Sequence, residues 1–173
     1  MKKEQNERTR KREKMVLEAR LADMEEDENR LQEERRNATS QNTVHSILDT
    51  MEMMSIHAET LHEELEKLND VTYDLGDLNM YIDDLEKRRE KRKLQFSELK
   101  EEVIIQEGQI DDQSLIKAER IKAFERWMDT KSELDEVKKQ SHILTTNLRC
   151  LRVLKSKMIK EVQAGDRKEN TND

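Results

Sequence analysis

The chain contains no proline and only three glycines in 173 residues. Compact domains reverse direction at turns that normally use these two residues, because proline presets the backbone angle φ and glycine reaches conformations closed to other residues. A chain so poor in both must run long distances without turning. Charged side chains make up 42% of the residues and aromatic ones 3%, so material for a large core is also scarce. The sequence therefore predicts an all-α protein of long helices.

Apolar residues recur at alternating intervals of three and four, which is the spacing of a coiled-coil seam. Two polar stretches that favour helix ends interrupt this seam, at Asn37 to Thr43 and at Gly108 to Ser114. Either Ser40 or Thr43 could cap the second helix. The predicted organisation is a charged N-terminal helix at 1–36, a break at 37–43, a long coiled-coil helix at 44–107, a turn at 108–114, a returning coiled-coil helix at 115–164 and a disordered tail at 165–173.

The seam of the long helix changes phase between Leu68 and Val71, where two intervals of three follow one another. Such a change overwinds a coiled coil locally. Gly76 follows closely, and a glycine inside a helix costs about 1 kcal/mol relative to alanine. These features predict a bend near residues 69–76.

The distribution of charge favours an antiparallel arrangement. Residues 59–86 contain ten acidic side chains and one basic one, whereas residues 138–160 contain seven basic side chains and no acidic one. If the chain folds back around residue 111, these two stretches face each other in an antiparallel helical hairpin. A parallel dimer would instead place each acidic stretch against its own copy, which like charges disfavour. A homodimer in which an unbroken helix pairs antiparallel with its twin about residue 111 would satisfy the same charges.

The sequence contains no recognisable catalytic or metal-binding motif. His57 and His62 are five residues apart and so lie on different faces of a helix. The single cysteine, Cys150, lies beside core positions of the seam, where a buried thiol is ordinary. No glycine-rich loop that could cradle a phosphate is present. We therefore expect no catalytic residue, no metal site and no cofactor, and hence no enzymatic activity.

Nucleic acids and lipid bilayers are weaker alternatives than protein partners. The basic residues between Lys2 and Lys14 lack the side-chain spacing that basic-zipper proteins use in the major groove, and the net charge is −7. No apolar run approaches the roughly 20 residues needed to span a bilayer, so we expect a cytoplasmic protein without integral membrane contact. The basic, amphipathic stretch 138–160 could still lie on an anionic membrane surface or tether membranes, which is the alternative function.

Two apolar clusters exceed what a two-helix seam requires and are candidate contacts for other chains. Methionine adapts to irregular partners, and a lone tryptophan on an aromatic-poor helix is a reasonable anchor. The predicted protein-interaction residues are Ile47, Leu48, Met51, Met53, Met54, Phe124, Trp127 and Met128. An irregular layer of the core would explain both clusters equally well.

Taken together, these patterns predict a non-catalytic coiled-coil structural or adaptor subunit of a larger assembly. Its partners would be other coiled-coil chains. A cytoskeletal setting, at a microtubule, cilium or kinetochore, is favoured by analogy with the long spacers found there. The basic residues Lys2 to Lys14 could contact an acidic polymer such as a microtubule.

Overall fold

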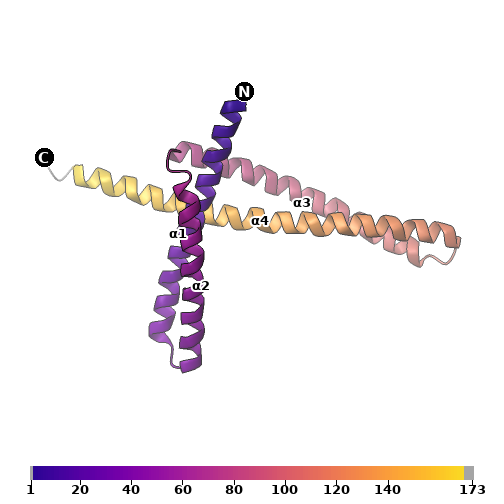
Figure 1. The fold of residues 1–173 in the computed structure, drawn as a ribbon. Coiled ribbons are helices and arrows are strands. Elements are labelled where there is room, and N and C mark those ends of the chain that lie inside the picture. The colour runs from indigo at the N-terminus through magenta and orange to yellow at the C-terminus, as the bar shows by residue number, and fades with distance from the viewer. Residues whose placement is uncertain (1, 170–173) are drawn as a thin grey trace. The chain divides into compact units, whose positions relative to one another are not determined.

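The computed structural model describes residues 2–169, and it describes the side chains of residues 3–164. Four long helices account for almost all of this part of the chain (Figure 1). They are α1 (Lys2–Asn37), α2 (Gln41–Glu66), α3 (Leu75–Asp111) and α4 (Lys117–Glu169). No strand occurs within residues 2–169, so the predicted all-α class is confirmed.

The single long helix predicted over 44–107 is wrong, because this region forms two helices. Helix α2 ends at Glu66, residues 67–74 are non-helical, and α3 begins at Leu75. The phase change and Gly76 led us to expect a bend at this place, and the structure has a complete interruption. Leu68 and Val71 are both buried in the core, although both lie in the non-helical stretch.

A reciprocal pair of side-chain hydrogen bonds begins α3. The backbone N–H of Asp77 donates to Asp74 Oδ1 at 2.8 Å, and the backbone N–H of Asp74 donates to Asp77 Oδ2 at 3.4 Å. This is a capping box with aspartate in the place of the usual glutamate, and it satisfies two backbone donors that a helix start leaves unpaired. The local chemistry therefore favours a new helix start here over a continuous helix.

The other boundaries differ from the predicted ones by a few residues. Gly108 lies inside the last turn of α3 and does not end it, and the connection to α4 comprises residues 112–116. Asp112 accepts a hydrogen bond from the backbone N–H of Ser114 at 2.8 Å, and hydrogen bonds from Ser114 lower the pKa of Asp112. Ser40 is the N-cap residue of α2, although its side chain forms no capping hydrogen bond.

Helix α4 extends to Glu169, into the stretch 165–173 for which the sequence predicts a disordered tail. Residues 170–173 lie outside the described part of the chain.

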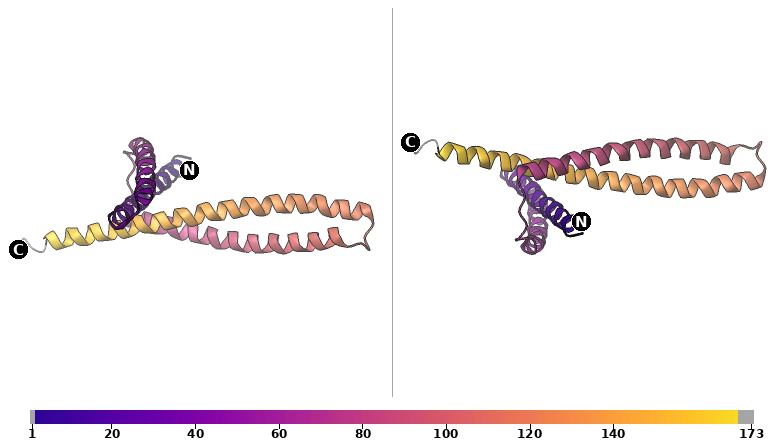
Figure 2. Two further views of the ribbon diagram at one scale, coloured as in Figure 1. Left: turned by 90° about the horizontal axis from the view of Figure 1, so that it is seen from below. Right: turned by 90° about the horizontal axis from the view of Figure 1, so that it is seen from above.

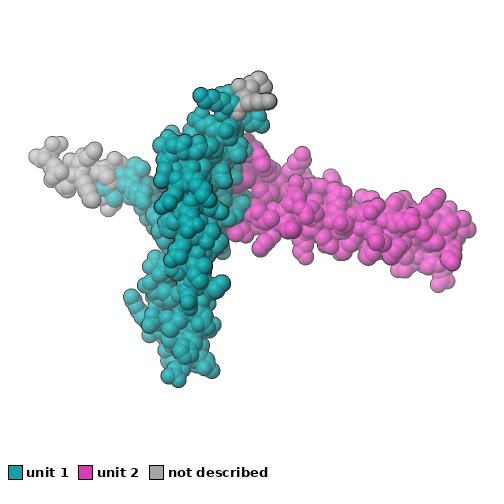
Figure 3. Space-filling model, in the orientation of Figure 1, with its two compact units in different colours: residues 1–82, 147–173 teal, residues 83–146 magenta. Residues whose placement is uncertain are grey.

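The chain divides into two compact units (Figure 3). Unit 1 comprises residues 1–82 and 147–173, and unit 2 comprises residues 83–146. Helices α1 and α2 thus belong to unit 1, together with the first residues of α3 and the C-terminal part of α4. Unit 2 consists of the remainder of α3 and α4.

The core of unit 1 is built around the pairing of α1 with α2. The short connection at residues 38–40 turns α2 back along α1 (Figure 1), and Leu17 of α1 packs in one cluster with Leu61, Leu68 and Val71. Further along the chain, Leu78, Leu148 and Leu151 are the largest completely buried side chains. Despite its high charge, α1 therefore contributes to the core through Leu17, with Leu21 and Met24 packed against it.

Opposite charges pair in unit 1, but with different partners from those predicted. Asp70 and Asp77 of the acidic stretch contact Arg10 and Lys11 of α1, at 2.6 and 2.9 Å. The basic stretch meets α1 as well, because Arg149 contacts Asp23 at 2.7 Å and Lys157 contacts Glu25 at 2.7 Å. The predicted pairing of 59–86 with 138–160 is thus wrong for these residues: the turn at 67–74 redirects the acidic stretch towards α1.

In unit 2, α3 and α4 lie side by side and antiparallel (Figure 2). Leu99 and Val103 of α3 pack with Leu134 and Val137 of α4, and Phe96 and Trp127 cover this cluster. One layer of the seam is polar: Gln106, 4% exposed, donates from Nε2 to Thr130 Oγ1 at 3.1 Å. A buried polar layer of this kind fixes the register of two helices at some cost in stability.

Truncation of Leu151 should destabilise the fold strongly. This side chain has no exposed surface, so the substitution Leu151→Ala is expected to lower the free energy of unfolding by about 2–5 kcal/mol through lost burial and a residual cavity. The matched control is Val162→Ala on the same helix, where the side chain is 60% exposed and a change within about 0.5 kcal/mol is expected. Urea denaturation followed by circular dichroism measures both, and equal losses would contradict the burial of Leu151.

Acid should loosen the start of α1 selectively. Hydrogen bonds from Arg10 and Lys11 hold the pKa values of Asp70 and Asp77 below their ordinary range. A carboxylate with a lowered folded-state pKa stabilises the fold above its ordinary pKa, and that contribution disappears as the pH falls through the folded-state value. Hydrogen exchange of residues 8–14, corrected for intrinsic rates, should stay constant from about pH 7 to 5 and rise below about pH 4.

The matched variant for this experiment is Asp70→Asn combined with Asp77→Asn. Its residues 8–14 should exchange faster at neutral pH and respond less to acid, since the two titrating partners are gone. Residues 99–103 of unit 2 serve as the internal reference. If the variant keeps the full acid response in α1, other carboxylates cause it and the assignment fails.

Candidate protein-interaction surfaces

The outer face of α2 combines exposed apolar side chains with unpaired carboxylates. Leu48, Met53 and Ile56 are 37%, 67% and 54% exposed. The helix carries six acidic residues and no lysine or arginine, and all six are exposed. Within the described residues, none of these carboxylates forms an ion pair; they are Asp49, Glu52, Glu59, Glu63, Glu64 and Glu66.

The structure divides the predicted methionine cluster between two sides of α2. Ile47 is buried, and Met51 and Met54 are half-buried, on the side that also carries the core residue Leu61. Leu48, Met53 and Ile56 point to the outer face. Only the outward members are accessible to another chain, so the cluster is part core and part surface.

The second predicted cluster lies in unit 2 and is divided in the same way. Phe124 and Met128 are 46% and 54% exposed, whereas Trp127 is half-buried and packs against the core of the unit. The rings of Phe124 and Trp127 stack with their centroids 5.7 Å apart. Trp127 Nε1 donates a hydrogen bond to Glu107 Oε1 at 3.2 Å. Phe124 and Met128 are thus the accessible members of the cluster, and Phe124 stacks on Trp127, which is fixed by the core and by Glu107.

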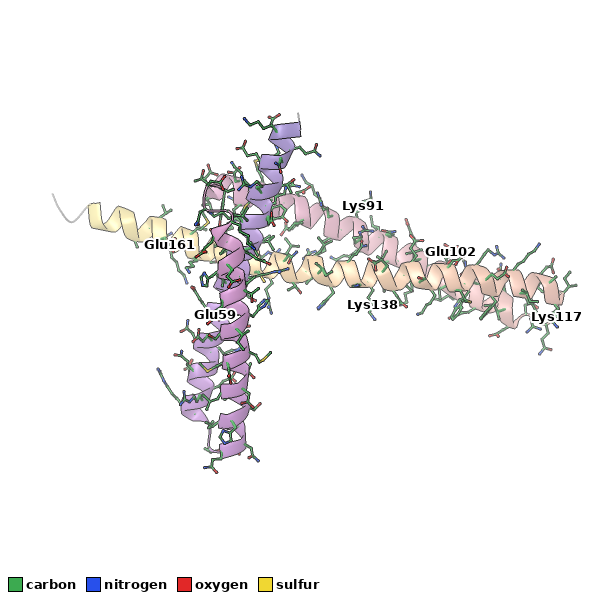
Figure 4. The ribbon with its side chains drawn as sticks, viewed as in Figure 1. Glu59, Lys91, Glu102, Lys117, Lys138 and Glu161 are labelled. Atoms are coloured by element: carbon green, nitrogen blue, oxygen red, sulfur yellow. The ribbon has the colours of Figure 1, made fainter. Side chains whose placement is uncertain are left out.

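A groove with basic and apolar walls lies between α3 and α4 in unit 2. The residues that line this basic groove are Arg88, Lys91, Arg92, Leu94, Gln95 and Glu98 of α3 and Gln140, Ile143 and Leu144 of α4. Leu94 and Ile143 are 68% and 48% exposed. Lys91 projects from α3 (Figure 4) and has no ion-pair partner within the described residues.

Sequence reasoning missed the basic groove, although a signal for it exists. Leu94 falls outside the seam that Phe96 and Leu99 define, and it directly follows the basic run 87–93. An aliphatic residue in that position is an exposed one. Its neighbour across the groove, Ile143, could not be inferred, since the register of the two helices is needed to bring them together.

A polar cluster fastens the turn at 67–74 to α1. Lys14 Nζ donates to the carbonyl oxygen of Val71 at 2.6 Å, and the hydroxyl of Tyr73 donates to the carboxylate of Glu18. Burial, together with the charge of Glu18, raises the pKa of Tyr73 far above its ordinary value, so the phenol stays protonated. These contacts hold the backbone in place, and we see no chemical role for them.

Neither metal binding nor thiol chemistry has a supporting geometry in the described residues. Within them, no group of three histidine, cysteine, aspartate or glutamate side chains is placed to hold a metal ion. Cys150 is 3% exposed, with its sulfur 3.5 Å from Asp23 Oδ2. Burial first, and then the negative charge of Asp23, raise the pKa of this thiol, which makes it a poor nucleophile. Within the same residues, no helix has the length and apolar character to cross a bilayer.

In comparisons with known proteins, no family model, no curated protein and no solved structure matches the chain. Its function must therefore be argued from its own surfaces. Three of these surfaces carry exposed apolar side chains: the outer face of α2, the Phe124 and Met128 patch, and the basic groove.

Cys150 should react slowly in the folded protein. Because the thiol is buried and its pKa is raised, its reaction with a disulfide reagent at neutral pH is expected to be at least about tenfold slower in buffer than in denaturing urea. The control combines Cys150→Ser with Ser55→Cys, which moves the thiol to an exposed position of α2. That variant should react at similar rates in both solvents, and fast labelling of native Cys150 would contradict its burial.

Proposed function

We propose that this chain is a non-catalytic coiled-coil adaptor or scaffold subunit of a larger protein assembly, with the cytoskeleton as its setting. The observation that carries this proposal is the presence of large exposed apolar side chains on helices that already bury another side. Coiled-coil helices of other chains are the partners that such surfaces fit, and a microtubule, cilium or kinetochore is the kind of assembly proposed.

The surfaces argue for protein partners because each joins apolar groups to polar or charged ones. Interfaces between proteins typically have apolar centres with polar rims. On α2, Leu48, Met53 and Ile56 lie among carboxylates, and in unit 2 Leu94 and Ile143 lie among basic side chains. Side chains of this size lose contact with water favourably when another helix covers them.

The cytoskeletal setting is proposed from helix length. Helix α4 has 53 residues, which corresponds to about 80 Å at 1.5 Å per residue. A helix of that length can present binding surfaces at a set spacing, as spacers in cytoskeletal assemblies do. This part of the proposal is an analogy of shape, since similar helices serve unrelated assemblies.

The alternative, a protein that lies on a membrane surface through 138–160, has less support. A bilayer would have to receive the apolar side of this stretch, but Leu148, Leu151 and Leu154 are at most 6% exposed. Two of its basic residues, Arg149 and Lys157, are already paired with Asp23 and Glu25. A helix that lies on a membrane surface needs an exposed apolar side and unpaired basic side chains.

Localisation and vesicle binding of the full chain together test the proposal. A fluorescent fusion is expected to colocalise with microtubules, cilia or kinetochores in cells, and the purified chain should bind phosphatidylserine vesicles no better than neutral ones. Replacing Leu48, Met53 and Ile56 by glutamine should reduce the colocalisation without loss of helicity, whereas Val162→Gln, at an exposed apolar position of α4, should not.

The opposite pattern would overturn the proposal. It comprises a diffuse fusion protein and salt-sensitive flotation with phosphatidylserine vesicles. Loss of that flotation in a variant with Lys138→Glu and Lys139→Glu would establish the membrane alternative, because both lysines are exposed and have no ion-pair partner in the described structure.

A further inference from the structure

We propose that the basic groove of unit 2 binds the outer face of α2 from a second copy of this chain. The inference rests on the proposed function and deepens it, since it names one of the protein partners. It follows from two surfaces that are complementary in charge and that both expose apolar side chains.

The basic groove offers a positive rim over an apolar floor. Lys91 is exposed and unpaired within the described structure, while Arg88 contacts Asp84 at 2.9 Å and Arg92 donates to Gln95 at 2.8 Å. Glu98 is the one acidic residue of the lining. Leu94 and Ile143, from opposite walls, leave 68% and 48% of their surfaces in water. The ligand that fits is an amphipathic helix with acidic flanks.

The outer face of α2 has the composition of that ligand. Leu48, Glu52, Ile56, Glu59 and Glu63 follow one another at intervals of 4, 4, 3 and 4, which places them on one side of the helix. Met53 lies beside Ile56 and is 67% exposed. The face spans about 22 Å from Leu48 to Glu63, and the groove residues Arg88 to Glu98 span about 15 Å, at 1.5 Å per residue. The stretch from Leu48 to Ile56, about 12 Å at the same rise per residue, can therefore lie over the groove, with Glu52 between its apolar residues and Glu59 and Glu63 beyond it.

A copy of this chain is the occupant because α2 is the helix that matches. Among the four described helices, α1, α3 and α4 all mix acidic and basic residues, whereas α2 carries acids alone. Every carboxylate of α2 is exposed and free of ion pairs in the described residues, as is Lys91 in the groove. Charges of this kind set the orientation and speed of association, while the apolar contacts supply most of the affinity.

The proposed contact joins two different surfaces, so it is heterologous. Such a contact either closes when each copy occupies the groove of the other, or continues from copy to copy into an open chain. Both outcomes raise the mass above the 20.7 kDa of one chain.

Sedimentation velocity of the full chain over a range of concentrations tests the proposal. The wild-type mass should rise with concentration and fall towards that of one chain as salt is added, because the rim contacts are exposed. Lys91→Glu should weaken association by at least about tenfold, since it places an acid against the acids of α2. Glu59→Lys combined with Glu63→Lys should do the same from the other surface.

The decisive measurement mixes these two variants. In each variant alone, like charges meet where position 91 of the groove faces positions 59 and 63 of α2. In an equimolar mixture, the substituted groove of one variant meets the substituted α2 of the other with opposite charges at these positions, and the unaltered groove meets the unaltered α2. Association should return close to the wild-type level. The matched control is Lys138→Glu, at an exposed lysine of unit 2 outside the groove (Figure 4), which should leave association unchanged. Circular dichroism melts confirm that all variants fold.

Three results would overturn the inference: a single-chain mass at every concentration, association that neither charge reversal weakens, or variants that fail to recover on mixing. A single-chain protein whose fusion still reaches cytoskeletal structures would refute self-association while leaving the proposed function standing. A self-associating chain that stays diffuse in cells would do the reverse.

Discussion

The capping box at Asp74 and Asp77 determines which helices can pair. It starts α3 at Leu75 and so separates the acidic stretch 59–86 into two helices joined by the turn at 67–74. The same Asp77 carboxylate accepts a hydrogen bond from Lys11, while Asp70 in the turn contacts Arg10. Residues 67–77 therefore follow the end of α2, begin α3 and attach the connection between these two helices to α1.

The fold class and much of the core could be predicted from the sequence, because both follow from local periodicity. Leu99 and Val103 are four residues apart, Leu134 and Val137 are three apart, as a coiled-coil seam requires, and all four are buried. The choice of partners could not be predicted. A seam tells which face of a helix is apolar, but several helices can cover that face equally well, and Tyr73 and Glu18 are joined across 55 residues of sequence. The basic groove was missed for the same reason.

A two-helix seam is narrow, and this narrowness explains both its polar layer and its exposed surfaces. Gln106 bonds Thr130 within the core of unit 2, yet Gln106 Oε1 has no hydrogen-bond partner among the described residues. Leaving a buried acceptor unpaired costs stability, and a polar layer compensates by excluding other registers. Because two paired helices bury only a narrow stripe of each other, apolar side chains such as Ile56 and Leu94 stay exposed to solvent. Such side chains are available for contact with other chains.

Gly76 occupies the one position in the capping box where a side chain would interfere. A Cβ atom there would lie 3.0 Å from Asp74 Oδ1, closer than an ordinary contact, and would press on the oxygen that caps α3. Asp74, Gly76 and Asp77 are therefore constrained together by the start of α3, whereas Leu75 between them is not part of this constraint. The start of α3 therefore tolerates fewer residues than the coiled-coil surface around it.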